Sequence, residues 1–145
     1  MFIWRVKVFM KTVVSLALAF VFLLFVKGIF VSRFQEEQGK REFYLRSASS
    51  QSLIKEKLSL FDLFSVKGES VSFACANEEE TLACLLARYN ARVLFEEEAG
   101  GTRSYYCVST KWTDGVLLNG VFVNLHIAFN GEACALGAPI IFGGF

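Results

Sequence analysis

Residues 116–145, VLLNGVFVNLHIAFNGEACALGAPIIFGGF, decide how the second half of the chain folds. Asn119-Gly120 predicts a hairpin turn, because both central positions of a type I′ turn need a positive φ, and Asn130-Gly131 predicts the next turn. From Val121 to Phe129 every second residue is a large apolar one, and the residues between them, which include Asn124 and His126, face the other side. This period of two is typical of a strand. Pro139 bends the chain before a last edge strand over residues 140–142. The stretch therefore predicts three antiparallel strands against which the earlier elements pack.

The preceding stretch predicts a helix followed by a hairpin. Asn77 and Glu80 have the spacing of a capping box, and Asn90 is suited to end the helix in a left-handed conformation. Residues 91–96 and 103–110 are rich in strand formers and flank a Gly-Gly turn, so they predict a hairpin.

The region between the N-terminal segment and this helix is less regular. In residues 47–60 apolar side chains recur at helical spacing after a run of serines, which predicts a helix. Residues 64–74 alternate around Lys67-Gly68-Glu69 and predict two short strands with a turn. The highly charged residues 33–46 predict either a helical extension of the N-terminal segment or a short tether.

Residues 12–31 predict a membrane anchor. Fifteen residues without a charge follow Lys11, and the whole run would be ~30 Å long as a helix, which matches a bilayer core. Lys27 would reach the headgroups from a position near the end of the span. A cleaved signal peptide is the alternative for residues 1–32, although no small-x-small cleavage site follows the apolar run.

The predicted molecule is a single-pass protein of the cell membrane with an α+β fold. Residues 1–32 form the anchor or signal, 33–46 the charged tether, and 47–145 one small domain. That domain would have an antiparallel sheet of about five strands, with two helices on one face. Basic residues lie on both sides of the span, so the positive-inside rule leaves the orientation nearly balanced. The short N-terminal tail favours the N-terminus inside and the domain outside the cell.

Charge and cysteine spacing exclude several classes of function. From Arg33 onward the chain has 11 basic and 14 acidic residues, which argues against a nucleic-acid partner. The four cysteines form no CxxC pair, and His126 is the only histidine, so we expect no metal site and no cofactor. The cysteines predict four buried apolar side chains, with two disulfides in one of three connectivities as the alternative.

His126, beside Asn124 on the more polar face of its strand, is the nearest feature to a site. An imidazole there could act as a general base or a metal ligand, with a carboxylate such as Asp114 or Glu132. No serine or cysteine stands at motif spacing from it. We therefore assign no catalytic residue and expect His126 to be structural.

Three short stretches of the last third resemble the YwmB-type exported proteins of Gram-positive spore formers. They are VNLHIA at residues 123–128, GAPII at 137–141 and the preceding YCVS at 106–109. The resemblance covers residues 73–145 and implies a TATA-box-binding-protein-like fold, with no activity to transfer. This chain is shorter than those proteins, and its ending IIFGGF is its own.

Two functions follow as hypotheses. The first is a membrane-anchored, extracytoplasmic, non-enzymatic interaction or envelope-structure protein with an unknown protein partner, linked to sporulation if the resemblance holds. The second is a small extracytoplasmic hydrolase that uses His126 with a carboxylate. The surroundings of His126 in the folded protein discriminate between them.

Overall fold

The computed structural model describes residues 2–28, 30–48 and 51–142 of the chain. Contacts within the chain divide it into two compact units, Met1–Val31 and Ser32–Phe145. Each unit is described by itself below.

The first unit is one helix, α1, which spans Phe2–Gly28. Wherever its side chains are described between Met10 and Val26, they are exposed, although most are large and apolar. Over the residues that the structure describes, no helix combines the length and the apolarity that a membrane crossing requires. The side chain of Lys27, predicted to reach the headgroups, lies outside the described side chains.

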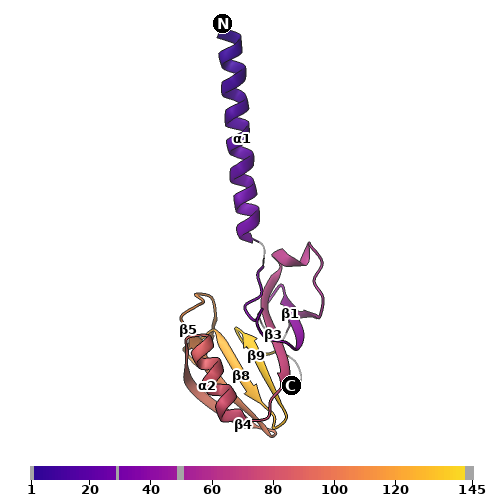
Figure 1. Cartoon of the computed structure of the whole chain (residues 1–145), viewed down its shortest axis with the longest axis vertical. Helices are drawn as coiled ribbons and strands as arrows, with labels where there is room; N and C mark the ends of the chain where they lie inside the picture. Colours follow the sequence, from indigo (N-terminus) through magenta and orange to yellow (C-terminus); the bar gives the residue numbers. More distant parts are fainter. Residues whose placement is uncertain (1, 29, 49–50, 143–145) are drawn as a thin grey trace. The chain divides into compact units, whose positions relative to one another are not determined.

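The second unit is α+β, as predicted, and is organised around one antiparallel sheet (Figure 1). The sheet has seven strands, more than the five or so expected, in the order β2-β1-β3-β9-β8-β5-β4. The bounds of its strands are β1 Lys40–Leu45, β2 Leu53–Lys55, β3 Val66–Ala74, β4 Ala91–Ala99, β5 Thr102–Ser109, β8 Leu125–Phe129 and β9 Ala133–Ala138.

The first half of this unit differs most from the sequence-based expectation. The predicted helix over residues 47–60 is wrong, because β2 forms there as a short edge strand, and a 3-10 helix, η1 (Asp62–Phe64), follows. A helical extension over residues 33–46 is also wrong, because β1 pairs with β3 inside the sheet. The two short strands expected in residues 64–74 are the single strand β3. Spacing alone does not separate helix from strand in short apolar segments, and sheet pairing decides between them.

The predicted helix after Asn77 is confirmed as α2, Glu78–Arg88. The Asn77 side chain accepts a hydrogen bond from the Glu80 amide at 3.2 Å, and Asn77 Nδ2 contacts the Glu80 carboxylate at 3.4 Å. Asn90 has a φ of 46°, so the left-handed residue after the helix is confirmed as well. Because the helix predicted over residues 47–60 is absent, α2 is the one α-helix that the structure describes in this unit.

The turns predicted at Gly100-Gly101 and Asn119-Gly120 are confirmed, whereas Lys67-Gly68-Glu69 lies inside β3 and forms no turn. The long strand after Val121 is not continuous. Gly100 and Gly101 join β4 to β5, and Asn119-Gly120 joins β6 (Val116–Leu118) to β7 (Val121–Val123), each with positive φ. At Asn124 the chain leaves this separate two-stranded sheet and enters β8 of the main sheet. The expected edge strand over residues 140–142 does not form, although Ile141 and Phe142 both donate backbone hydrogen bonds to side chains.

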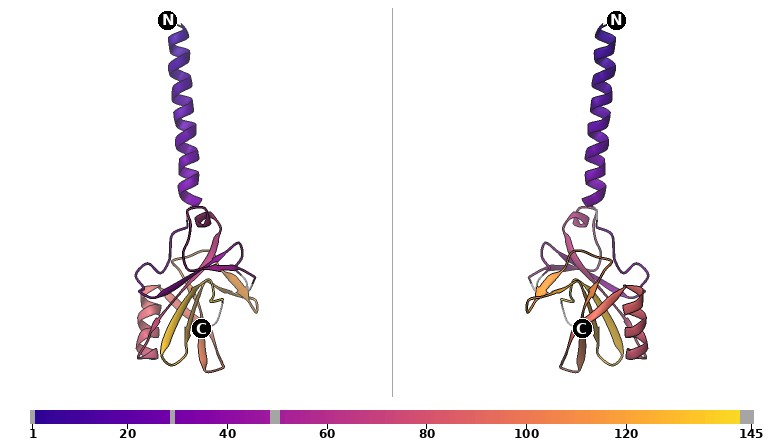
Figure 2. Two further views of the ribbon diagram at one scale, coloured as in Figure 1. Left: turned by 90° about the vertical axis from the view of Figure 1, so that its right-hand side faces the viewer. Right: turned by 90° about the vertical axis from the view of Figure 1, so that its left-hand side faces the viewer.

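The core lies on one face of the sheet, under α2 and under residues 32–39, which we call the strap (Figure 2). Leu85 of α2 and Phe34 of the strap pack with Leu125, Ile127 and Phe129 of β8. The strap needs Gly39, because a Cβ there would lie 2.1 Å from the Ser72 carbonyl oxygen of β3. The N-terminal residues of this unit are therefore part of its core.

Candidate functional site

His126 lies on the sheet face opposite the core and is itself buried. Its ring stacks on Tyr106 with centroids 4.5 Å apart, and Tyr106 stacks on Phe95 at the same spacing. Gly137 is its partner on β9, and a Cβ on that glycine would lie 2.5 Å from the Ile141 nitrogen. The segment after β9 therefore folds back over the imidazole.

The chemistry of His126 follows from this enclosure. Its Nδ1 accepts a hydrogen bond from the Ile141 amide at 3.2 Å, so the neutral ring carries its proton on Nε2. Nε2 is buried and has no hydrogen-bond partner among the described residues. Burial lowers the pKa of His126 to about 4, because the charged form is poorly solvated there. His126 is therefore a neutral imidazole at pH 7, enclosed within the domain.

The acidic residues proposed as partners of His126 lie in other parts of the domain. Asp114 forms an ion pair with Arg33 of the strap. Glu132 lies in the turn between β8 and β9, at the other end of β8 from His126. Its backbone carbonyl accepts a hydrogen bond from the Cys75 amide at 2.9 Å. The structure does not bring His126 together with either carboxylate, so the hydrolase hypothesis gains no support from it.

Asn124, the polar neighbour of His126, holds two backbone segments together. Its Oδ1 accepts the Ser109 amide at 2.6 Å, and its Nδ2 donates to the carbonyls of Ser109 and Trp112, both at 2.9 Å. The side chain is fully buried. The side chain thus satisfies the backbone of Ser109, the last residue of β5, at the point where the chain passes from β7 to β8. This role is structural.

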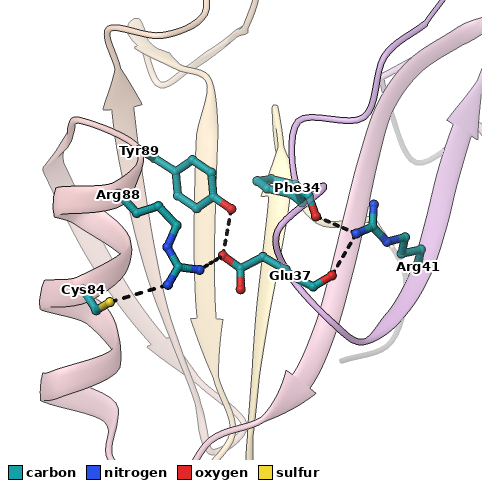
Figure 3. Close-up of polar contacts among 6 residues, drawn as sticks. All are labelled: Phe34, Glu37, Arg41, Cys84, Arg88 and Tyr89. Atoms are coloured by element: carbon teal, nitrogen blue, oxygen red, sulfur yellow. Dashed lines mark hydrogen bonds and ion pairs between the residues drawn. The ribbon is translucent and has the colours of Figure 1, made fainter.

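The strap carries a polar cluster that the sequence did not reveal (Figure 3). The Glu37 carboxylate accepts hydrogen bonds from Arg88 Nη1 at 2.5 Å and from the Tyr89 hydroxyl at 2.8 Å. Arg41 donates to the carbonyls of Phe34 and Glu37, at 2.6 and 2.8 Å. The cluster joins the strap to the end of α2 on one side and to β1 on the other.

A second carboxylate fixes the start of the strap. Glu69 of β3 is almost fully buried and accepts hydrogen bonds from Ser32 Oγ at 2.7 Å and from the Arg33 amide. Burial raises its pKa, an effect that these hydrogen bonds and the nearby arginines oppose. Phe34 is fully buried between Tyr89 and Trp112, with ring centroids 5.6 and 5.9 Å away. In the sequence, the one signal for this packing was Phe34, the single aromatic residue among the polar residues of the strap.

A groove of about 200 Å³ opens beside the strap. Arg33, Arg88 and Lys111 line it together with Tyr89 and Trp112. The Arg33 guanidinium lies 5.3 Å from the Trp112 ring centroid, and the Lys111 ammonium 5.9 Å from that of Tyr89. Ligand pockets usually hold ~300–1,000 Å³, so this groove fits a side chain or a small anion rather than a cofactor.

No group of three or more metal-ligating side chains occurs among the residues that the structure describes. Comparison of the chain with family models, with curated proteins and with solved structures gives no match. The resemblance to YwmB-type proteins therefore stays a prediction.

Proposed function

We propose that the protein is a non-enzymatic interaction or envelope-structure protein, held at the cell membrane by residues 12–31 with its domain outside. One observation carries the proposal. Helix α1 exposes large apolar side chains along its length, among them Leu18 at 65% and Phe22 at 64%. Such a surface is unfavourable in water and needs lipid or protein to cover it. The uncharged run from Thr12 to Val26 favours lipid.

The strap supports an interaction role for the attached domain. Phe34, Glu37 and Arg41 build the first residues of the second unit into its core, so the domain begins directly after residue 31. A folded domain that begins at residue 32 can present its surface to a partner. The proposed link to sporulation rests on the YwmB resemblance alone.

Fractionation of cells that express the full chain tests the anchor. Replacing Leu18 and Phe22 together by Asp should move the protein out of the membrane fraction, because each charge costs ~2.5–3.5 kcal/mol near the centre of a span. The matched control Lys27→Leu should stay in the membrane. Retention of the double Asp variant, or an intact wild-type chain in the soluble fraction, would contradict the proposal.

The orientation is tested through Cys84, which is exposed in α2. A membrane-impermeant maleimide should label the full chain in intact cells if the domain is outside, and the Cys84→Ser variant should lose most of that label. Labelling that appears only after permeabilisation would place the domain inside.

A further inference from the structure

Residues 59–62 form a tight turn whose two corner residues are large and apolar. The Asp62 amide donates to the Ser59 carbonyl at 3.1 Å, which places Leu60 and Phe61 at the corners. Leu60 is 66% and Phe61 84% exposed. Turn corners usually carry Gly, Pro, Asn, Asp or Ser, so the choice of Leu-Phe needs an explanation outside the turn itself.

The turn is closed by the carboxylate of Asp62. Both of its oxygens accept from Lys55 Nζ at 2.9 Å, and Oδ2 also accepts from the Ser59 amide at 2.9 Å and its hydroxyl at 2.8 Å. The Lys55 and Ser59 hydrogen bonds lower the pKa of Asp62 to about 2, so the carboxylate stays ionised at physiological pH. These hydrogen bonds therefore hold the turn in one conformation in which Leu60 and Phe61 are exposed to solvent.

Further apolar side chains adjoin the turn. Phe64 follows in η1 and is exposed, as are Leu53 and Ile54 on the edge strand β2. The Lys55–Asp62 ion pair joins β2 to the turn, so Leu53, which shares a strand face with Lys55, lies on the same surface as the turn, whereas Ile54 points to the opposite face of β2. We call residues 53–67 the apolar edge.

The charge around the apolar edge is positive. Residues 46–67 contain four basic and two acidic residues, and the acids Asp62 and Glu56 are ion-paired to Lys55 and Lys40. Arg46, Lys57 and Lys67 lie outside these pairs and are exposed. Residues 68–145 contain four basic and nine acidic residues, a net charge of −5. The domain is therefore polarised, with its basic side at the apolar edge.

Arg46 occupies a backbone conformation that favours glycine. Its φ is 69°, and its amide donates to the Ser65 carbonyl at 2.8 Å. A left-handed conformation costs a non-glycine residue roughly 1–2 kcal/mol. An arginine at this position adds a positive charge beside η1, which a glycine would not supply.

The apolar edge lies where the domain begins. Residue 32, the first of the domain, bonds to Glu69 near the start of β3, and η1 leads directly into β3. Ser32 and η1 are therefore both connected to the first half of β3.

We propose that the apolar edge docks on an anionic lipid bilayer, with Leu60 and Phe61 in the headgroup region and Arg46, Lys57 and Lys67 facing acidic headgroups. This inference rests on the proposed membrane attachment and adds a second contact to it. A projecting turn with a basic rim suits a fluid, negatively charged surface, since apolar insertion and cationic attraction act together there. The acidic remainder of the domain would be repelled from the same surface, which orients the docked state.

The experiment uses the full chain in vesicles and an environment-sensitive dye. Ser replaces Cys75 and Cys84, and the dye is attached at Leu60→Cys or, as a matched control, at Glu132→Cys. Glu132 lies beside the other end of β3, whose nine residues span ~30 Å. In vesicles that contain phosphatidylserine we expect blue-shifted emission and quenching by lipid-borne quenchers at position 60, and neither at position 132.

Two further variants test the chemistry of docking. Phe61→Asp should abolish the blue shift at position 60. Lys57→Gln and Lys67→Gln should each lower the ratio of buried to exposed dye by roughly fivefold, since a lysine near an anionic surface contributes about 1 kcal/mol. Vesicles of phosphatidylcholine alone should give a weaker shift than the anionic ones.

The outcomes separate this inference from the proposed anchor. If the full chain floats with the vesicles but the dye at position 60 stays in water, docking is overturned and the anchor stands. If the wild-type chain does not float with the vesicles, the proposed attachment is overturned and docking with it. A blue shift that depends on protein concentration instead of lipid would assign the apolar edge to contact between copies of the chain, and would also overturn docking.

Discussion

At the scale of single residues, the buried side-chain amide of Asn124 stabilises the point where the chain passes from the two-stranded sheet into the main sheet. It satisfies the amide and carbonyl of Ser109 and the carbonyl of Trp112. We expect Asn124→Leu, which nearly keeps the volume, to lower the free energy of unfolding by roughly 3 kcal/mol, because three backbone groups lose their partner. Denaturant unfolding of the full chain in detergent measures the loss.

Asn130 provides the matched control for this prediction. It is exposed, and its side chain accepts one hydrogen bond, from the Ala133 amide at 3.1 Å. Asn130→Ala should therefore cost less than about 1 kcal/mol. Equal losses in the free energy of unfolding for the two variants would show that the buried amide of Asn124 stabilises the fold no more than an exposed hydrogen bond does.

His126 predicts a pH dependence of stability. Its pKa is about 4 in the folded protein, below the ordinary 6.5, so the unfolded chain takes up the proton first as the pH falls. The stabilising contribution is complete above pH 6.5 and is lost progressively towards pH 4. Between pH 7 and pH 5 we expect the free energy of unfolding to fall by about 2 kcal/mol.

A His126→Phe variant separates this effect from other titrations. Phe can keep the stack on Tyr106 but loses the acceptor for the Ile141 amide, so the variant should be less stable at pH 7. Its free energy of unfolding should then change little between pH 7 and pH 5. A wild-type pH profile that survives in this variant would exclude His126 as its source.

At the scale of elements, the strap is the part of the fold with the clearest energetic role. Phe34 is fully buried, whereas Phe61 is 84% exposed, so the same substitution tests both environments. We expect Phe34→Ala to lower the free energy of unfolding by roughly 3–5 kcal/mol and Phe61→Ala to change it by no more than about 0.5 kcal/mol.

Hydrogen exchange supplies a second measurement for the strap. Removal of the Phe34 ring should raise the exchange rate of residues 32–39 above that of β8, because the strap then loses its packing before the sheet opens. An unchanged exchange pattern in Phe34→Ala would show that Glu37 and Arg41 hold the strap without the aromatic contact.

Elements with a local chemical signal were predicted from the sequence, and elements set by distant pairing were not. Asn77, Asn90 and Asn119-Gly120 act through the backbone beside them, and each lies where expected. The spacing of Leu53 and Ile54 with later apolar residues suggested a helix, but pairing with β1 makes residues 53–55 a strand. Pairing with β1 is invisible in the local period.

The candidate site was predicted only in part for the same reason, because its contacts join residues that are distant in the chain. His126 was assigned to a strand, as found, but to a more polar face, because the segment that encloses it comes from residues 139–142. The strap cluster was missed for a similar reason. Glu37 and Arg88 are 51 positions apart in the chain, and no local pattern relates them.

At the scale of the whole molecule, the sheet keeps the cysteines apart. All four are free, and Cys107 and Cys134 are fully buried on β5 and β9. Since β8 lies between these strands, they are separated by two strand spacings of ~4.8 Å, and a disulfide needs Cα atoms within ~7 Å. Cys75 and Cys134 are diagonal across β3 and β9, where the register pairs Phe73 with Cys134, and such neighbours lie ~7–8 Å apart.

The last prediction is therefore a pattern of thiol reactivity across the chain. Burial raises the pKa of Cys107 to about 12 and that of Cys134 further, so neither forms a thiolate at neutral pH while the protein is folded. Cys84 is exposed and Cys75 partly so. Thiol titration of the native full chain should detect Cys84 first and Cys75 more slowly, and titration after denaturation without reductant should detect all four. If Cys75 and Cys134 appeared only with reductant, they would form a disulfide that the described sheet does not allow, and β3 and β9 would need a different register.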